Sequence, residues 1–420
     1  MNRLFNKNFY LLWQGQLISQ IGNQAFEIAL LFWIKHATGS ATLMGLIMMA
    51  STLPSVLLGP VGGTFADLHS RKRILVISDL ICGTILFLMT AALFLWQSNT
   101  NLIICCLFTT SVFISTVNSF FKPAISASIP DLVPLDKIAA ANSLNESSVQ
   151  ISTFIGQGLG GVLFRLLGPV TLFLADGISF FLAAFSESLI TIPQVIPEKK
   201  TGFSEIFRHF KLETIEGFRY VWQRKGIRNL FVIAAFLNFF MIPVITLLPF
   251  YIEDVLKATT DWYGYLLAGF GFGALIGYTF AGTVRVSGKV RSIIVPILIV
   301  VNSAAMGLLA LLSSPIQAML LMFLAGIMNG FINISIITIL QLTTASEIRG
   351  RVFGLLGTIC SGITPIAMGL AGVVADLLNK NIPAIYIFCG SAGAILSLLV
   401  GLDRATREFL AYEPEKPRQH

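Results

Sequence analysis

Charged residues are scarce in this sequence. Only 12% of its 420 residues are Asp, Glu, Lys or Arg, which is about half the share found in soluble globular proteins. Hydrophobic residues make up 55% of the chain. A chain with so little polar surface cannot coat a water-soluble globule. The composition therefore predicts an all-α protein that crosses a lipid bilayer several times.

Cysteines and histidines are few, and they form no metal-binding motif. The five cysteines lie inside apolar runs without partners at metal-ligand spacing, and the four histidines are scattered. The sequence also lacks a Gly-x-x-x-x-Gly-Lys loop that would hold nucleotide phosphates. We therefore expect no metal site, no cofactor and no transport driven by ATP.

Long apolar segments recur along the whole chain. A helix needs about 20 apolar residues to cross a bilayer, and the sequence contains about twelve such runs. The predicted crossings are approximately 9–34, 42–66, 74–96, 101–122, 144–167, 169–192, 229–252, 262–284, 292–312, 315–341, 351–377 and 382–402. No small-residue cleavage site follows the first run, so we expect a membrane helix there rather than a signal peptide.

Lysines and arginines are distributed unevenly between the two sides of this topology. With the N-terminus placed in the cytoplasm, all but four of the 28 basic residues lie on the cytoplasmic side. The exceptions are Lys35, Arg165, Lys257 and Lys380. Because this follows the positive-inside rule, the net charge of +7 indicates topology rather than nucleic-acid binding. We expect a multi-pass protein of the cytoplasmic (inner) membrane with both termini in the cytoplasm.

The segment 193–228 is the one sizeable polar piece between the predicted crossings. Its apolar residues fall at helical spacing among charged ones, which predicts an amphipathic helix at the membrane surface. The two halves that it separates repeat short pairs, such as Gly63-Thr64 and Gly282-Thr283. We therefore predict parallel repeats. The predicted parts are an N-terminal six-helix bundle 1–192, the linker 193–228, a C-terminal six-helix bundle 229–402 and a cytoplasmic tail 403–420.

The first predicted helix carries a stripe of polar residues. Steps of four, three and four residues place most of them on one face, with one beside it. The stripe comprises Gln16, Gln20, Asn23, Gln24 and Glu27. An acid inside a membrane helix faces a cavity or a partner, because lipid does not solvate it. We expect these residues to line a substrate cavity and Glu27 to bind the coupling proton. The alternative is a structural polar seam between helices.

Three further acids lie within the predicted crossings. Glu187 is a second candidate for proton coupling, but its position near the cytoplasmic end would also let its carboxylate reach water. We interpret Asp79 and Asp176 as satisfied structural or interfacial acids. Arg165 is close enough in sequence to pair with Asp176 across the loop between the fifth and sixth crossings.

The loop between the second and third crossings combines glycines, one acid and three consecutive cations. Its spacing resembles motif A of the major facilitator superfamily, although Leu68 and Ser70 depart from that pattern. The residues on the pattern are Gly63, Asp67, Arg71 and Lys72. The resemblance implies a major facilitator fold, with twelve helices in two six-helix bundles and a substrate site between them. It also implies that this loop is a conformational switch that stabilises the outward-open state.

Other stretches resemble more specific branches of that superfamily. Gly156, Gly158, Gly160 and Gly161 in the fifth crossing favour close helix packing, and they resemble motif C of the drug-exporting branch with Gln157 at the usual proline. The segment 121–144 resembles the macrolide-efflux and enterobactin-exporter branch. The fourth crossing lacks the intramembrane arginine of many drug/proton antiporters, which gives Glu27 more weight.

The resemblance implies a secondary active transporter that exports amphipathic, macrolide- or multidrug-like compounds by proton antiport with alternating access. Its partners would be a small-molecule substrate, protons and the lipid bilayer, without nucleic acid, and the protein would be a monomer. The alternatives on the same fold are a siderophore exporter and a nutrient importer. The apparent lack of a central cation favours neutral or cationic substrates.

An intramembrane enzyme is a hypothesis of a different class. It would use Glu27 and Glu187 as acid and base, and it would need a nucleophile or metal set near the middle of the membrane. The scattered histidines and unpaired cysteines do not supply such a set. We therefore do not expect the protein to be an enzyme.

Overall fold

The computed structural model describes residues 5–194, 215–283 and 286–413. These ranges contain helices and connecting turns but no strands, which confirms the predicted all-α polytopic fold. The chain divides into two compact units. The first comprises Met1–Arg208 and Thr259–Gly264, and the second comprises His209–Ala258 and Tyr265–His420. The main division falls inside the segment that the sequence analysis assigns to the linker.

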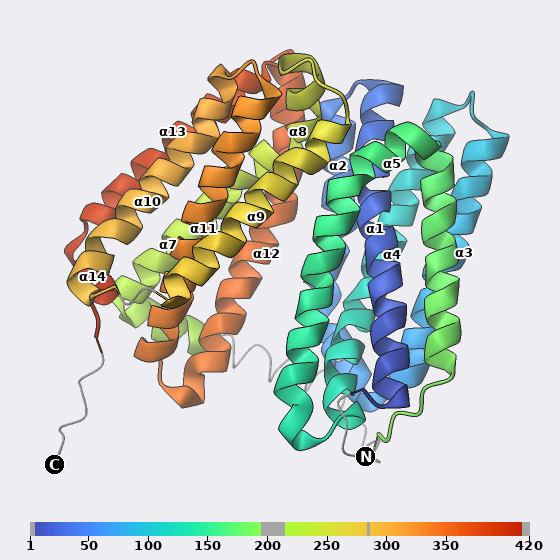
Figure 1. Cartoon of the computed structure of the whole chain (residues 1–420), viewed down its shortest axis with the longest axis horizontal. Helices are drawn as coiled ribbons and strands as arrows, with labels where there is room; N and C mark the ends of the chain where they lie inside the picture. Colours follow the sequence, from blue (N-terminus) through green and yellow to red (C-terminus); the bar gives the residue numbers. More distant parts are fainter. Residues whose placement is uncertain (1–4, 195–214, 284–285, 414–420) are drawn as a thin grey trace. The chain divides into compact units, whose positions relative to one another are not determined.

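The first unit is built from five long helices and one short helical turn (Figure 1). They are α1 (Lys7–Thr38), α2 (Ala41–Leu68), α3 (Arg71–Leu95), α4 (Thr100–Leu132), η1 (Leu135–Lys137) and α5 (Ile138–Ser188). Polar residues before the apolar runs set the helix starts, because their side chains accept the unpaired N–H groups of the first turn. Asn6, Ser40, Ser70 and Asn99 cap α1 to α4 in this way.

Helix α5 contains a sharp reversal that makes it two membrane crossings. Gly168 has φ 74° and ψ 167°, a conformation that is essentially restricted to glycine. Pro169 follows at the start of the returning half, where its fixed φ suits a helix start. Eleven helices of the described ranges are long and apolar enough to cross a bilayer. Because α5 counts twice, they account for the twelve predicted crossings.

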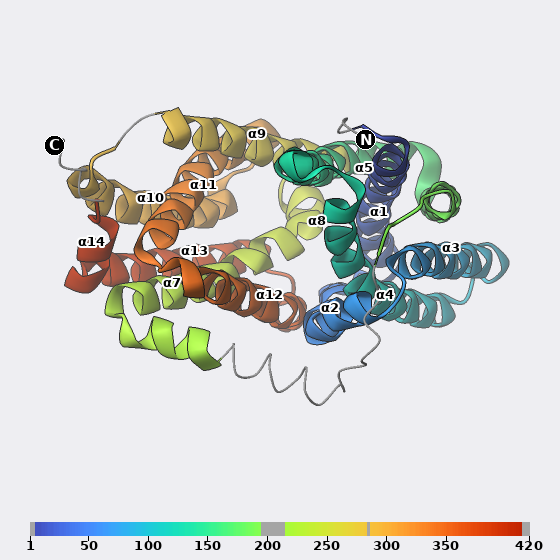
Figure 2. The same cartoon turned by 90° about the horizontal axis from the view of Figure 1, so that it is seen from below.

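Helix α1 lies between the two halves of α5 and packs along both, and α2 packs along α4 (Figures 1 and 2). The α2–α4 contact depends on Gly62, since a Cβ at this position would overlap the carbonyl oxygen of Ser119. Gly63, the glycine on the motif A pattern, has no atom within 4 Å of such a Cβ. The close approach of these helices therefore depends on the neighbouring glycine rather than on the motif glycine.

The second unit contains six long helices, with short helical pieces between and after them. They are α7 (Lys225–Thr246), α8 (Leu248–Phe250), η2 (Tyr251–Val255), α9 (Asp261–Thr283, whose first residues belong to the first unit), α10 (Gly288–Leu308), η3 (Leu309–Leu311), α11 (Pro315–Thr343), α12 (Ser346–Leu377), α13 (Ile382–Leu402) and α14 (Arg404–Leu410). Two fully buried tyrosines, Tyr251 and Tyr386, have ring centroids 5.1 Å apart at a tilt of 34°. Their hydroxyls donate to the backbone carbonyls of Leu309 and Val244, respectively.

The predicted linker and tail are described only in part. Residues 215–223 form a helix whose Gly217 and Val221 are buried while most of its other residues are exposed. The segment 195–214 lies outside the described residues. The predicted tail begins with α14, which Asp403 caps by accepting from Thr406 N at 3.1 Å and from Asn229 Nδ2 at 2.8 Å. These hydrogen bonds lower the pKa of Asp403. The tail is thus anchored to the start of α7.

We expect Gly168→Ala to lower the stability of the protein by about 1–3 kcal/mol, because alanine is strained in this backbone conformation. A Cβ at Gly168 would meet no atom within 4 Å. A loss of stability in this variant would therefore come from backbone strain and not from a steric clash. Thermal unfolding in detergent measures the change. Gly158→Ala is the matched control, since Gly158 is helical and its Cβ position is also open. Equal stability of the two variants would contradict the role of Gly168.

Candidate functional site

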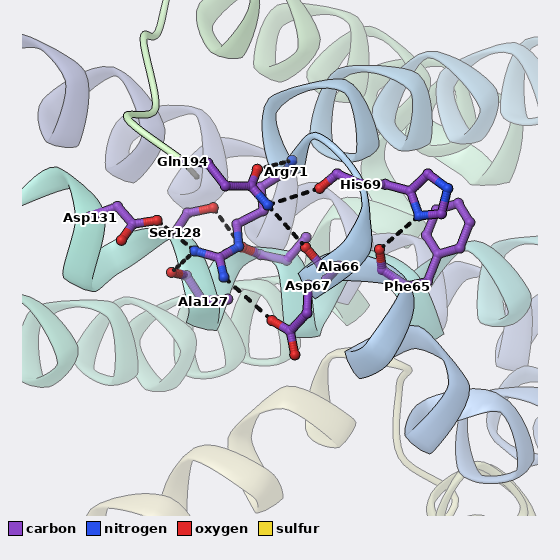
Figure 3. A network of polar contacts seen from close by, with 10 residues as sticks. Phe65, Ala66, Asp67, His69, Arg71, Ala127, Ser128, Asp131 and Gln194 are labelled. Carbon is purple, nitrogen blue, oxygen red and sulfur yellow. Dashed lines mark hydrogen bonds and ion pairs between the residues drawn. The ribbon is translucent and has the colours of Figure 1, made fainter. Parts of the chain in front are cut away.

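The loop between α2 and α3 holds the charged cluster that the sequence analysis identifies. Helix α2 ends at Leu68, and α3 begins at Arg71. The Arg71 guanidinium donates to Asp131 Oδ2 at 2.5 Å and to the carbonyl of Ala127 at 2.8 Å, both on α4 (Figure 3). It contacts Asp67 Oδ1 at 3.3 Å. Arg71 therefore joins α2, α3 and α4 at one end of the first unit.

The two acids of this cluster differ in exposure. The Asp131 side chain is 30% exposed, whereas that of Asp67 is 67% exposed. Charge pairs that are more shielded from water interact more strongly. Asp131 is thus the main partner of Arg71. Asp131 lies beyond the predicted fourth crossing, 101–122, and is not among the predicted site residues, whereas α4 continues to Leu132.

Gln194 completes the cluster from the segment that follows α5. Its Oε1 accepts from Arg71 N at 2.9 Å, and its Nε2 donates to the carbonyls of His69 and Ala66 at 3.0 and 3.4 Å (Figure 3). One amide therefore pairs with the start of α3 and the end of α2. Lys72, also predicted for the switch, makes no hydrogen bond or ion pair within the described part of the chain.

The polar stripe of α1 is not uniform in its surroundings. Gln16 is only 3% exposed and donates to Glu187 Oε1 at 2.8 Å, so α5 covers this end of the stripe. Gln20 and Asn23 are half-buried. Gln24 accepts from Gln157 Nε2 at 2.8 Å, which ties α1 to α5. Helical periodicity predicts the shared face but not which part of it another helix covers.

Glu27 lies at the other end of the stripe, and its side chain is exposed. The residues directly before and after it, Phe26 and Ile28, are buried. Its carboxylate has no hydrogen-bond or ion-pair partner among the described residues. An accessible, unpaired carboxylate in the middle of an apolar helix can take up a proton or a cationic group.

Lys122 is the cation whose charge acts on Glu27. Lys122 stands at the cytoplasmic end of the fourth predicted crossing, 101–122. The structure places it ten residues before the end of α4, about 15 Å along the helix. Prolines are tolerated in membrane helices when other groups satisfy the freed carbonyls. The charge of Lys122 therefore acts from within α4 rather than from its end.

The remaining acids are buried. Glu187 and Asp79 are each 1% exposed and Asp176 is 0% exposed, so all three carboxyl groups lie inside the protein rather than at its surface. One carboxylate oxygen of each acid has no hydrogen-bond donor. Arg165 does not pair with Asp176 but forms an ion pair with Asp261 at 3.0 Å. Burial and orphaned oxygens distinguish these acids from satisfied structural ones.

The glycines of the fifth crossing lie in different surroundings. A Cβ at Gly156 would overlap Gln24, and a Cβ at Gly160 would overlap Ile28, so both glycines let α5 approach α1 closely. Gly161 lies against the backbone of Thr260, whereas the Cβ position of Gly158 is open. The described ranges contain no group of three His, Cys, Asp or Glu residues that could hold a metal ion.

Comparisons with known proteins agree with this architecture. The profile of the transmembrane secretion effector family matches residues 2–419. Macrolide efflux protein A of Streptococcus pyogenes is 25% identical over 379 residues, 89% of this chain and 90% of that protein. The multidrug efflux pump Tap of Mycolicibacterium fortuitum is 23% identical over 407 residues, 93% and 96% of the two chains.

Solved structures with the same fold include transporters of several kinds. A bacterial homologue of the iron transporter ferroportin, in an inward-facing state, superimposes with a TM-score of 0.69 at 15% identity, covering 94% of this chain and 98% of that one. A bacterial homologue of the human lysosomal transporter Spinster has a TM-score of 0.66 at 16% identity, covering 96% of both chains. At these identities the likeness shows the fold alone.

We expect Asp131→Asn to destabilise the protein more than Asp67→Asn does. Loss of the Asp131 charge weakens a hydrogen-bonded pair with a largely buried arginine, at a cost of about 1.5–3 kcal/mol. Loss of the exposed Asp67 charge costs about 0.2–1 kcal/mol. Thermal unfolding of both variants in detergent provides the comparison, and a larger loss in Asp67→Asn would refute the order of the two acids.

Proposed function

Because the chain belongs to the transmembrane secretion effector family of major facilitator transporters, we propose that it exports amphipathic organic compounds in exchange for protons. Membership of this family makes it a transporter of small molecules. Macrolide-like or multidrug-like substrates are supported by the names of the relatives, macrolide efflux protein A and the multidrug efflux pump Tap. The proposed location is the inner membrane, with both termini in the cytoplasm and the protein acting as a monomer.

The observation that carries the exchange mechanism is the state of Glu27. It is the exposed acid of the α1 stripe, and it has no partner in the described part of the chain. A proton from outside and a substrate from the cytoplasm would compete for this carboxylate. Each would then displace the other, which couples their movements in opposite directions. Gln20 and Asn23, half-buried on the same face, would contact the polar groups of the substrate.

Lys122 limits the substrates that this site would accept. Its positive charge acts on ionised Glu27 without forming an ion pair with it, so it partly offsets the negative charge of the site. Protonation of Glu27 leaves the lysine charge uncompensated, and this change would release a cationic compound. A bulky amphipathic substrate with one amine suits these charges better than a polyanionic siderophore does.

The α2–α3 loop would act as the conformational element of alternating access. Arg71 links three helices of the first unit through Asp67, Asp131 and the Ala127 carbonyl. Rocking of the units requires such end contacts to form in one state and to break in another. The acid–base pair Glu27 and Glu187 of an intramembrane enzyme gains no support, because Glu27 is exposed while Glu187 is buried beside Gln16.

We expect Glu27→Gln to fold normally but to lose proton-coupled efflux, because glutamine cannot bind and release a proton. Purified protein in liposomes with an imposed pH gradient would be tested with macrolides, lipophilic cations and siderophores. The expected result is gradient-dependent movement of a macrolide or cation by the wild type, and movement at the level of protein-free liposomes by Glu27→Gln.

Glu146→Gln is the matched control, since Glu146 is an exposed acid near the start of α5. It should keep the wild-type rate. Wild-type efflux by Glu27→Gln would exclude Glu27 as the coupling site. Movement of siderophores alone would replace the proposed substrate class with that of a siderophore exporter.

A further inference from the structure

Three helices of the first unit bring two buried acids together. Asp79 on α3 and Glu187 near the end of α5 are each 1% exposed, and their carboxyl groups are neighbours that act on each other electrostatically. Gln16 of α1 donates to Glu187 Oε1 at 2.8 Å. The two acids come from positions 108 residues apart in sequence, so only the packing of α3 against α5 creates this pair.

The two carboxyl groups lack one hydrogen-bond donor. An ionised carboxylate accepts hydrogen bonds but donates none. Asp79 Oδ2 and Glu187 Oε2 are buried and have no donor, and Gln16 supplies a donor only to the other oxygen of Glu187. A hydrogen bond between the two carboxyl groups therefore requires a proton on one of them. A single proton would satisfy both orphaned oxygens.

The charges around the pair do not offer a substitute for that proton. Within the described residues, neither acid forms an ion pair with a lysine or arginine. Asp176 of α5 is a further acid whose charge acts on Asp79. Cys82, on α3, lies near both Asp79 and Asp176. The group that α1 contributes, Gln16, is neutral. Two adjacent carboxylates without a cation cannot both ionise in such a site, and no third ligand for a metal ion is present in the described part of the chain.

We propose that Asp79 and Glu187 form a second proton site, in which the two carboxyl groups share one proton, separate from Glu27. When the proton is bound, one carboxyl group is neutral and the other is an anion. The shared proton and the Gln16 amide then supply the hydrogen bonds that their oxygens need. Removal of the proton leaves two anions between α3 and α5, which repel one another in a medium that screens them poorly.

The position of this site connects it to the α2–α3 loop. Asp79 lies eight residues after Arg71 on the same helix, about 12 Å along its axis. Glu187 lies seven residues before Gln194, whose amide holds the start of α3. Separation of α3 from α5 on loss of the proton would pull on the Arg71–Gln194 contact. This link to transport rests on the proposed function, whereas the shared proton does not.

Infrared spectroscopy of the purified protein in detergent tests the proposal directly. The carbonyl stretching band of a protonated carboxyl group is recorded while the pH is raised from acidic to alkaline. In the wild type we expect such a band to persist at neutral pH. Asp79→Asn and Glu187→Gln should each abolish it, because the new amide supplies the missing donor and the remaining acid can ionise.

Two control variants make the assignment specific. Asp176→Asn removes another buried acid of α5, and Glu27→Gln removes the proposed transport acid, so both should retain the band of the pair. Gln16→Leu keeps both carboxyl groups but removes the donor to Glu187, so it should shift the frequency of the band. This variant tests the site even when Asp79→Asn or Glu187→Gln does not fold.

Three results would overturn the proposal. They are the absence of the band from the wild type at neutral pH, its persistence in both Asp79→Asn and Glu187→Gln, and its loss on addition of Na⁺, which would identify a cation site instead. Because the readout needs no substrate, it is independent of the liposome experiment. If Glu27→Gln retains the band and also shows wild-type efflux, Glu27 is not the coupling residue. The proposal of a second proton site at Asp79 and Glu187 then still holds.

Discussion

A polar group inside a membrane helix must find its partner within the protein, because lipid offers none. The first unit meets this constraint by concentrating its polar groups where α1, α3, α4 and α5 pack together. Arg71 is held by Asp131 and the Ala127 carbonyl, and Gln16 donates to Glu187. The acids left with an unpaired oxygen, and the exposed Glu27, are exceptions that can titrate. These exceptions are the groups on which proton exchange can act.

The buried polar groups of the two units differ in kind. The buried interior of the first unit contains Asp79, Asp176 and Glu187, whereas that of the second is rich in hydroxyls and an amide, such as Thr246, Ser303 and Asn302. Its buried Tyr251 and Tyr386 donate to backbone carbonyls and need no proton exchange. A repeated architecture therefore carries titratable chemistry in one half, while the other half is suited to packing and apolar contact with a substrate.

Close helix contacts recur at corresponding places in the repeat. In the first unit, Gly62 lets α2 approach the backbone of α4. In the second unit, α9 and α11 meet through glycines on both helices: Gly273 and Gly277 lie against backbone carbonyls of α11, and Gly326 and Gly330 lie against backbone carbonyls of α9. Such contacts bring backbones together without long side chains between them, which suits membrane helices that gain little from the hydrophobic effect. They give each unit rigid helix pairs.

The sequence by itself determined the class of fold, because the length of apolar runs and the asymmetry of basic residues follow directly from the thickness and charge rules of a bilayer. It also determined the stripe on α1 and the charged α2–α3 loop, since both are local in sequence. Only the tertiary structure decided which of these groups are buried, paired or open. The Asp79–Glu187 pair and the partnership of Arg71 with Asp131 depend on contacts between segments that are distant in sequence. The position of Lys122 within α4 depends on prolines that the packed helix tolerates. Local periodicity contains no information about either.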